Sequence, residues 1–295
     1  MIETTDQQKC RRRIQFCIFT GCFAFKSFFT SVYGALEVLP VGGRALGMGS
    51  AYVSVAKGPE SVFFNPAGLF LSDRAAVSLF ISHPYGLKEL MYEAISSVLP
   101  TSCGNLGFSL QTFGHTLYRE NTFAIGWGKG YKNRIGCGVL VRAAQIQIQR
   151  YGSETSILMD AGCLIRLNKN LTWGMAFANL NGRTLGRQKE SLPQIIRIGL
   201  SGIPIQGFLL SVEIDKDERF APELKGGCEI RPLSTLSLRW GFGRDPSFFS
   251  LGIGLSWGIF TCDYGFTSHP VLGATHQSSI TIQFKSSKDK SSSRL

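Results

Sequence analysis

Residues able to carry acid–base or metal chemistry are few in this chain and stand far apart. Its four histidines fall at expected strand ends or loops, without the short spacing of a metal site: His83, His115, His269 and His276. No nucleophile turn G-x-S-x-G, zinc motif H-E-x-x-H, Walker sequence or dinucleotide fingerprint occurs. The sequence therefore predicts neither an enzyme nor a cofactor or metal site. A hydrolase assembled from Ser, His and Asp on different strands is the alternative that motifs do not exclude.

Cysteine chemistry is not indicated either. Five of the eight cysteines lie beyond residue 34, and most of them sit inside runs of alternating apolar residues: Cys103, Cys137, Cys163, Cys228 and Cys262. The number is odd and no C-x-x-C pair is present, so we expect small buried or lipid-facing side chains.

Charged residues recur at positions expected to face the inside of a sheet structure. They carry both signs and are Arg142, Asp160, Arg166, Arg197, Glu213, Asp215, Lys225, Glu229, Arg239 and Asp263. If the sheet lies in a membrane, these side chains cannot face the lipid, because an Arg or Lys near the bilayer midplane costs about 2–4 kcal/mol of stability. We expect them to pair across strands inside a wet or plugged lumen.

The elements that must position these charges are strands with one oily face. In a pleated strand alternate side chains share a face, which groups Leu236, Leu238, Trp240 and Phe242 on one side. The other side carries Ser, Arg and Gly and is too polar for a dry core. The sequence therefore predicts an all-β, antiparallel transmembrane β-barrel that turns its apolar face to lipid. A soluble β-sandwich, whose oily faces meet inside, is the alternative.

About fourteen alternating segments run from about Ala75 to Phe284. Lys169-Asn170 and 232–234 are expected to be tight hairpin turns, and 181–193 and 268–277 exposed loops. The apolar register shifts between Val141 and Ile146, for which we expect a bulge near Ala143-Ala144.

The two ends of the chain differ from the middle. Arg11, Arg12 and Arg13 precede a short Phe-rich apolar run, which predicts a signal peptide over 1–34 cleaved near Gly34. A lipoprotein site at Cys22 is the competing interpretation. Residues 285–295 form a basic, polar tail. Because the net charge of +11 lies partly in these ends, a nucleic-acid partner is not expected.

Residues 41–56 read V-G-G-R-A-L-G-M-G-S-A-Y-V-S-V-A, and 61–69 read S-V-F-F-N-P-A-G-L. Two such motifs in this order resemble the N-terminal signature of the FadL-like outer-membrane barrels, especially the short PorV/PorQ-type members. The resemblance covers most of 41–284 and implies a fourteen-stranded barrel at 75–284 with a hatch at 35–74 inside its lumen. The hatch residues it implies are Gly43, Arg44, Ala45, Leu46, Gly47, Met48, Gly49, Asn65, Pro66, Ala67 and Gly68.

Physical reasoning gives this segment a plausible form. Its glycines permit tight backbone packing, and Asn65-Pro66 favours a turn before the first strand. Arg44 is expected to form an ion pair that holds the plug, with an inward acid such as Glu213 or Asp160. Apolar residues at inward positions are expected to form a greasy lumen patch: Leu140, Leu158, Leu164 and Phe80.

The resemblance implies a passive outer-membrane channel for small hydrophobic compounds such as fatty acids, in contact with outer-membrane lipid. FadL-type carriers are usually longer, with large outer loops, so their entry-site residues cannot be transferred to this chain. A PorV-like, non-transporting barrel that binds a secreted protein is the alternative. Ile280, Ile282 and Phe284 resemble the signal read by the barrel-assembly machinery, here followed by the tail.

Overall fold

The computed structural model describes residues 36, 37, 39–185, 190–244 and 247–284. The predicted signal peptide with its cleavage position, the Cys22 lipoprotein site and the C-terminal tail lie outside these residues. Among the residues described, no helix is long and apolar enough to cross a membrane.

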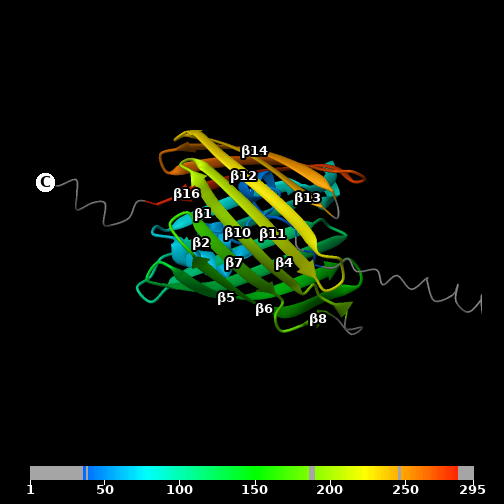
Figure 1. Ribbon diagram of the computed structural model, residues 1–295. Coiled ribbons are helices and arrows are strands. Elements are labelled where there is room, and N and C mark those ends of the chain that lie inside the picture. Colours follow the sequence, from blue (N-terminus) through cyan, green and yellow to red (C-terminus); the bar gives the residue numbers. More distant parts are fainter. Residues whose placement is uncertain (1–35, 38, 186–189, 245–246, 285–295) are drawn as a thin grey trace, which may run out of the picture. The chain divides into compact units, whose positions relative to one another are not determined.

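Antiparallel strands form a closed barrel of fourteen strands, as the alternation predicts, and the sandwich alternative is wrong (Figure 1). Along the sequence, each barrel strand pairs with the next, and β1 closes the barrel against β16. Their bounds are β1 (Ala76–His83), β2 (Tyr92–Leu99), β3 (Asn105–Gly114), β4 (Tyr118–Tyr131), β5 (Ile135–Ile148), β6 (Gly152–Arg166), β7 (Leu171–Ala178), β10 (Ile195–Ile205), β11 (Phe208–Asp217), β12 (Glu223–Leu233), β13 (Leu236–Arg244), β14 (Phe248–Trp257), β15 (Phe260–His269) and β16 (Gly273–Gln283). The short strands β8 (Thr184–Leu185) and β9 (Glu190–Ser191) form a separate hairpin between β7 and β10.

The outer face of the barrel is apolar and the inner face is small or polar. On β13, Trp240 is 43% exposed and Phe242 57%, whereas Arg239, the residue before Trp240, points to the inner face and is only 4% exposed. Of the five cysteines beyond residue 34, which are free thiols, Cys103, Cys137 and Cys262 are exposed, Cys163 is half-buried and Cys228 is buried. Because the sheet closes on itself, its apolar face forms the outer surface of the barrel.

The two ends of the barrel differ in their connections. At the end where β1 begins and β16 finishes, called the turn end here, the strands are joined by short turns such as 206–207, 234–235 and 258–259. The opposite end, called the loop end, carries the longest connection, 179–194, in the region expected to be a loop. The loop expected at 268–277 is wrong, because β15 and β16 continue through most of it and meet in a tight hairpin at 270–272.

The bulge expected at Ala143-Ala144 is absent. β5 pairs with both neighbours without a break in register from Ile135 to Ile148. The apolar pattern changes because Ala144 and Ile146 face inward, where they pack with Leu158 and with Leu192 from the 179–194 connection. An oily cluster inside the lumen, and not a backbone irregularity, thus explains the shifted pattern.

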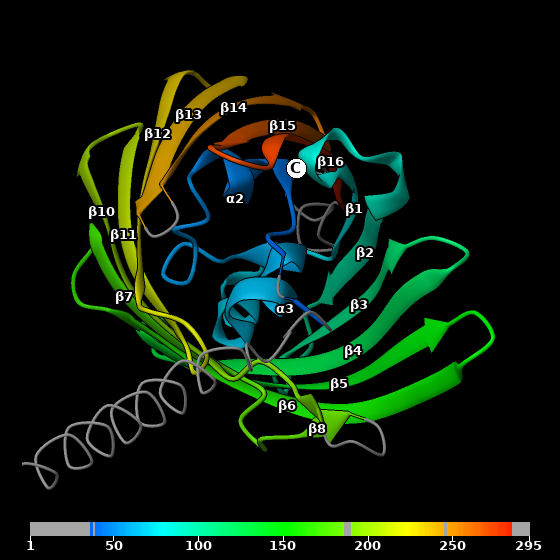
Figure 2. The ribbon, with the colours of Figure 1, turned by 90° about the vertical axis from the view of Figure 1, so that its right-hand side faces the viewer.

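The segment before β1 folds into short helices within the barrel (Figure 2). They are α2 (Gly43–Gly47), η2 (Gly58–Glu60), α3 (Ser61–Phe64) and η3 (Pro66–Leu71); two more 3₁₀ turns, η4 (Pro84–Gly86) and η5 (Lys88–Leu90), lie between β1 and β2. We call residues 41–72 the plug. Helices of this length are not stable alone, so their shape depends on packing against the wall.

Inward-facing glycines of the barrel wall receive the plug backbone. A Cβ on Gly252 of β14 would lie 2.9 Å from the Cα of Gly47 in α2. On β4, a Cβ on Gly128 would lie 2.8 Å from the Cβ of Leu69 and 2.9 Å from the carbonyl oxygen of Pro66. Real Cβ atoms do not approach so closely, so the plug fits this wall only because both wall positions lack side chains.

Candidate functional site

Arg44 ties the plug to the wall through Glu229 of β12. Its Nε lies 2.8 Å from Oε2 of Glu229, and its Nη2 donates to Oε1 at 3.1 Å. The ion pair that the sequence predicted for Arg44 is therefore present, but the expected partners, Glu213 and Asp160, are wrong. Glu213 instead accepts the backbone N–H of Val53 at 2.6 Å, and Asp160 pairs with Arg142.

Glu229 is a centre of charge that the sequence did not single out. Besides Arg44 it binds Arg239 at 2.6 Å and Arg231 at 2.7 Å, and Arg239 continues to Asp263 at 2.7 Å. Inward charges of opposite sign thus pair across β12, β13 and β15, as expected. These wall residues surround Arg44 and hold the Glu229 carboxylate in place, so that the Arg44 guanidinium has a fixed, bidentate partner.

A second polar link lies within the plug itself. The Tyr52 hydroxyl donates to Oε2 of Glu60 at 2.7 Å and accepts a hydrogen bond from Nη1 of Arg44 at 3.1 Å. Burial, together with the nearby Asp263 carboxylate, raises the pKa of Glu60, and burial also raises the pKa of Tyr52. The sequence did not predict a role for either residue. A signal was present for Glu60, because it is the sole acid within 41–72.

Asn65 fixes the second motif. Its Oδ1 accepts the N–H of Ala67 at 3.1 Å and so caps η3, while its Nδ2 donates to the carbonyl oxygens of Val53 at 2.9 Å and Cys163 at 3.1 Å. Pro66 follows at the first position of the turn, where a missing N–H costs nothing. Asn65 therefore links η3, the earlier part of the plug and β6 in one fully buried side chain.

The two predicted motifs lie in different places in the lumen. Residues 43–49 form α2 and the turn after it, beside β13, β14 and β15, whereas residues 65–68 open η3 beside β4, β5 and β6. They are joined by a buried apolar cluster of Ala45, Met48, Tyr52, Ala56 and Phe64. A further residue not predicted, Asn105 of β3, donates to the carbonyl oxygens of Leu69 at 2.7 Å and Ser72 at 2.8 Å and holds the end of η3.

The expected greasy lumen patch is inward but does not line an open channel. Leu140 packs with Val62 and Leu69 of the plug, and Phe80 with Val41. Leu158 belongs to the cluster around Leu192, and all of these side chains are buried. Most of this apolar surface is therefore occupied by the plug.

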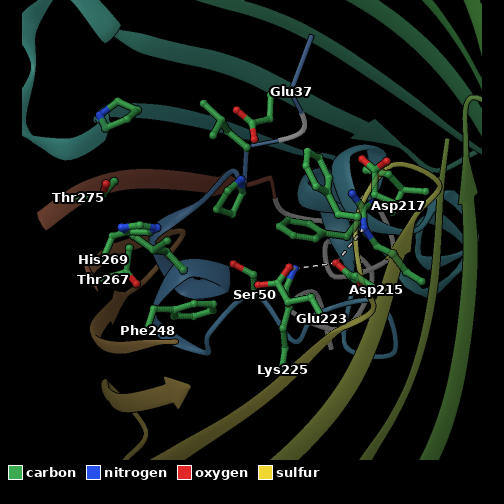
Figure 3. Close-up of a pocket in the computed structure, with 18 of the residues that line it drawn as sticks. Glu37, Ser50, Asp215, Asp217, Glu223, Lys225, Phe248, Thr267, His269 and Thr275 are labelled. Carbon is green, nitrogen blue, oxygen red and sulfur yellow. Dashed lines mark hydrogen bonds and ion pairs between the residues drawn. The ribbon is translucent and has the colours of Figure 1, made fainter. Parts of the chain in front are cut away.

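At the loop end, a cavity of about 550 Å³ lies above the plug; we call it the loop-end chamber. Figure 3 shows its charged and aromatic lining, which comes from the plug, from strand ends and from the loops. Its apolar part includes Leu39, Leu46, Phe63, Phe64, Phe220 and Phe248. This chamber could hold a compact apolar molecule.

The charges of β10, β11 and β12 that line the loop-end chamber are paired. Asp215 binds Lys225 at 2.6 Å and Arg197 at 3.6 Å, and Lys225 also binds Glu223 at 3.1 Å. Arg197 reaches the plug as well, where it donates to the carbonyl oxygen of Phe63 at 3.4 Å. A guest in the chamber would therefore contact a charge cluster that is itself bonded to the plug.

A second cavity of about 490 Å³ lies at the turn end. It is polar and is lined by Arg44, Lys57, Glu60, Arg74, Arg231 and Asp263 among others. The two cavities share no lining residue, and plug residues line both of them. The plug therefore lies between the mainly apolar loop-end chamber and the charged cavity at the turn end.

The sequence matches no family model and no curated protein. Its structure is similar to that of the Ralstonia pickettii toluene transporter TbuX, with a TM-score of 0.68 and 11% identity over 84% of this chain and 100% of that chain. A Pseudomonas aeruginosa FadL homologue gives 0.65 and 11% over 84% and 99%, and the monoaromatic hydrocarbon channel CymD gives 0.65 and 12% over 85% and 100%. At such low identity the similarity establishes the fold.

Proposed function

We propose that this chain is an outer-membrane barrel that lets small hydrophobic compounds diffuse passively across the membrane, with the plug as its hatch. The observation that carries this proposal is the loop-end chamber, a mainly apolar cavity that the plug closes on the side of the turn end while it is bonded to the chamber wall. The motif residues Gly43–Gly49 and Asn65–Gly68 are assigned to the hatch because they form many of its contacts with the strands.

The membrane placement rests on the outer surface. Large apolar side chains such as Leu79, Val139, Ile198 and Leu251 are exposed on strands all around the barrel. An apolar belt of this extent is unfavourable in water and suits lipid. Both ends of the barrel sequence lie at the turn end, which we place toward the periplasm because short turns face that side in such barrels.

The chamber supports a small apolar ligand. A volume of about 550 Å³ lies within the usual range of small-molecule sites, about 300–1,000 Å³. Two proteins with this fold handle such molecules: TbuX is a toluene transporter, and CymD is a monoaromatic hydrocarbon channel. Passage requires the plug to shift, and the plug's polar links to the wall, such as Arg44–Glu229 and Val53–Glu213, are the contacts that must loosen.

A pair of adjacent phenylalanines on β14 provides the test. Phe248 lines the loop-end chamber, whereas Phe249 is 52% exposed on the outer face. Phe248→Ala removes apolar contact area from the ligand, and at about 25 cal/mol per Å² this loss corresponds to binding about 5- to 30-fold weaker. Uptake and binding of labelled toluene and labelled fatty acid by proteoliposomes would be measured for both variants.

Uptake that is reduced by Phe248→Ala and unchanged by Phe249→Ala supports the chamber as the entry site. Equal uptake by both variants and the parent protein would contradict it. Deletion of 41–68 tests the hatch separately, because selective uptake of the ligand should be lost without it.

A second candidate, a non-transporting barrel that binds a secreted protein, is favoured by the short loop-end connections at 115–117, 149–151 and 270–272. These three short connections would offer a docking surface beside the longer connection 179–194. Proteoliposomes without uptake, together with a protein partner that co-purifies from the native membrane, would select this function.

The assembly signal remains part of the proposal. Ile280 and Phe284 are exposed near the C-terminal end of β16, where assembly factors could reach them. Substitution of both by Ser should reduce insertion of the barrel into membranes without changing the lumen.

A further inference from the structure

A cluster of cations lies at the turn end of β4 to β7, away from the loop-end chamber. It consists of Lys129, Lys132, Arg134, Arg166 and Lys169, of which all but Arg166 are exposed. Within the described part of the chain, none of the five forms an ion pair with a carboxylate. The six turns at this end contain no Asp or Glu at all, so the cluster is not neutralised by its neighbours.

Two adjacent turns hold these cations in place. Lys132 and Asn133 have positive φ values of 48° and 52°, as in a tight two-residue hairpin turn. Arg134 donates from Nε and Nη2 to the carbonyl oxygens of Arg166 and Leu167 at 3.3 and 3.4 Å, and Arg166 donates back to the carbonyl oxygen of Asn133 at 3.2 Å. The hairpins β4–β5 and β6–β7 are thereby tied together at the turn end, which places their cations in one region. Arg166 itself lies over the ring of Phe70 in the plug, 5.9 Å from the ring centroid, so the four exposed cations form the accessible part of the cluster.

The same face continues directly into the apolar outer wall. Tyr131 is 65% exposed, and Ile135 and Leu167 are exposed beside it. Lys129 points outward on β4 between Trp127 and Tyr131, since its neighbours Gly128 and Gly130 meet plug residues. A cationic rim above an apolar surface matches a molecule with an anionic head and acyl chains.

We propose that this face binds the headgroup of an anionic phospholipid, a phosphodiester monoanion of the phosphatidylglycerol class, from the leaflet at the turn end. The exposed cations Lys129, Lys132, Arg134 and Lys169 contact the phosphate, and the acyl chains lie along Tyr131, Ile135 and Leu167. This inference goes beyond transport and rests only on the membrane placement of the barrel. Each cation at a membrane surface contributes about fivefold to such binding at low salt.

The test uses Trp127 as a reporter, because it is exposed on β4 two residues from Lys129. The other tryptophans are replaced by Phe: Trp173, Trp240 and Trp257. This full-length protein is reconstituted in phosphatidylcholine vesicles that contain increasing amounts of phosphatidylglycerol, with brominated acyl chains on one lipid or the other. Quenching of Trp127 then reports which lipid occupies this face.

We expect at least tenfold preference for brominated phosphatidylglycerol at low ionic strength. The Lys129→Gln, Lys132→Gln, Lys169→Gln variant should bring this preference to within about twofold of unity. The side chains of these three lysines make no hydrogen bond to the backbone in the described part of the chain, so the turns remain intact. The matched control removes three exposed cations at the loop end, Lys88→Gln, Arg119→Gln and Arg150→Gln, and should keep the preference.

Equal quenching by the two lipids in the reporter protein would overturn the proposal, and so would a preference that survives the turn-end substitutions or falls equally in the loop-end control. A soluble anionic protein as the true partner also predicts equal quenching. Co-flotation of every variant with the vesicles is measured in parallel. Failure to float contradicts the membrane placement, whereas loss of lipid preference in a floating barrel contradicts this site alone.

Discussion

The bond between Arg44 and Glu229 should control how often the plug leaves the wall. Arg44→Met removes a bidentate guanidinium–carboxylate pair and the hydrogen bond to Tyr52, while it keeps a side chain of similar length. Breaking a buried pair costs about 3–5 kcal/mol when one charge is left alone. Here Glu229 keeps Arg239 and Arg231, and the Arg44 side chain is 21% exposed, so we expect about 2–3 kcal/mol.

This free energy corresponds to a 30- to 150-fold increase, roughly, in the population of the displaced plug. Amide hydrogen exchange measures it directly, because the N–H of Ser50 is protected by the carbonyl oxygen of Ala45 at 2.9 Å. Under conditions where opening and closing are fast, exchange of the amides over 46–50 should accelerate by that factor. Exchange in the barrel strands should not change.

Arg231→Met is the matched control. Arg231 binds the same carboxylate at 2.7 Å, but it belongs to the wall and its side chain is 54% exposed. It should leave plug exchange within about twofold of the parent, since an exposed pair contributes about 0–1 kcal/mol. Equal acceleration in both variants, or none in Arg44→Met, would refute the assignment of Arg44 as the plug anchor.

Three further perturbations test the plug. Gly252→Ala should push Gly47 away at a cost of about 1–3 kcal/mol and raise ion conductance in planar bilayers, whereas Gly202→Ala, with no contact closer than 3.6 Å, should not. Asn65→Ala should raise protease cleavage within the plug several-fold, because it removes a cap and two further hydrogen bonds; unchanged cleavage would contradict its role. Burial raises the pKa of Glu60, so the folded plug binds an extra proton, and its stability falls as pH rises above about 4.5 toward that raised pKa. Conductance should rise with pH across this window, and Glu60→Gln should flatten that part of the profile; an identical profile in both proteins would rule out Glu60 as its source.

The alternation of side chains predicted the barrel well because it is a local property. Trp240 and Phe242 alternate with Arg239 and Gly241, and this pattern alone distinguishes an oily face from a polar one. The pattern failed where the lumen is not uniformly polar. Ile146 faces inward and packs against Leu192. Because we expected every apolar residue of a strand to face outward, we wrongly predicted a bulge in this strand.

Motif reasoning located the plug segment but not its partners. The glycines around Arg44 indicated close packing, and Asn65-Pro66 indicated a turn, both from local chemistry. Glu229 could not be chosen over Glu213 or Asp160, because all three are inward acids on strands of similar composition. The choice depends on where α2 lies along the barrel, and Gly47 can reach only wall positions that lack a side chain, such as Gly252.

The sequence by itself determined an antiparallel barrel with an outward apolar face, lumenal charges of both signs and a glycine-rich segment ahead of the first strand. Only the tertiary structure decided which charges meet, that the plug separates a mainly apolar chamber from a charged one, and that a group of cations without carboxylate partners among the described residues gathers at the turn end. The physical reason is distance along the chain. Side-chain alternation is set by neighbouring residues, whereas Arg44 and Glu229 are 185 positions apart and meet only once the closed barrel has fixed the register of every strand between them.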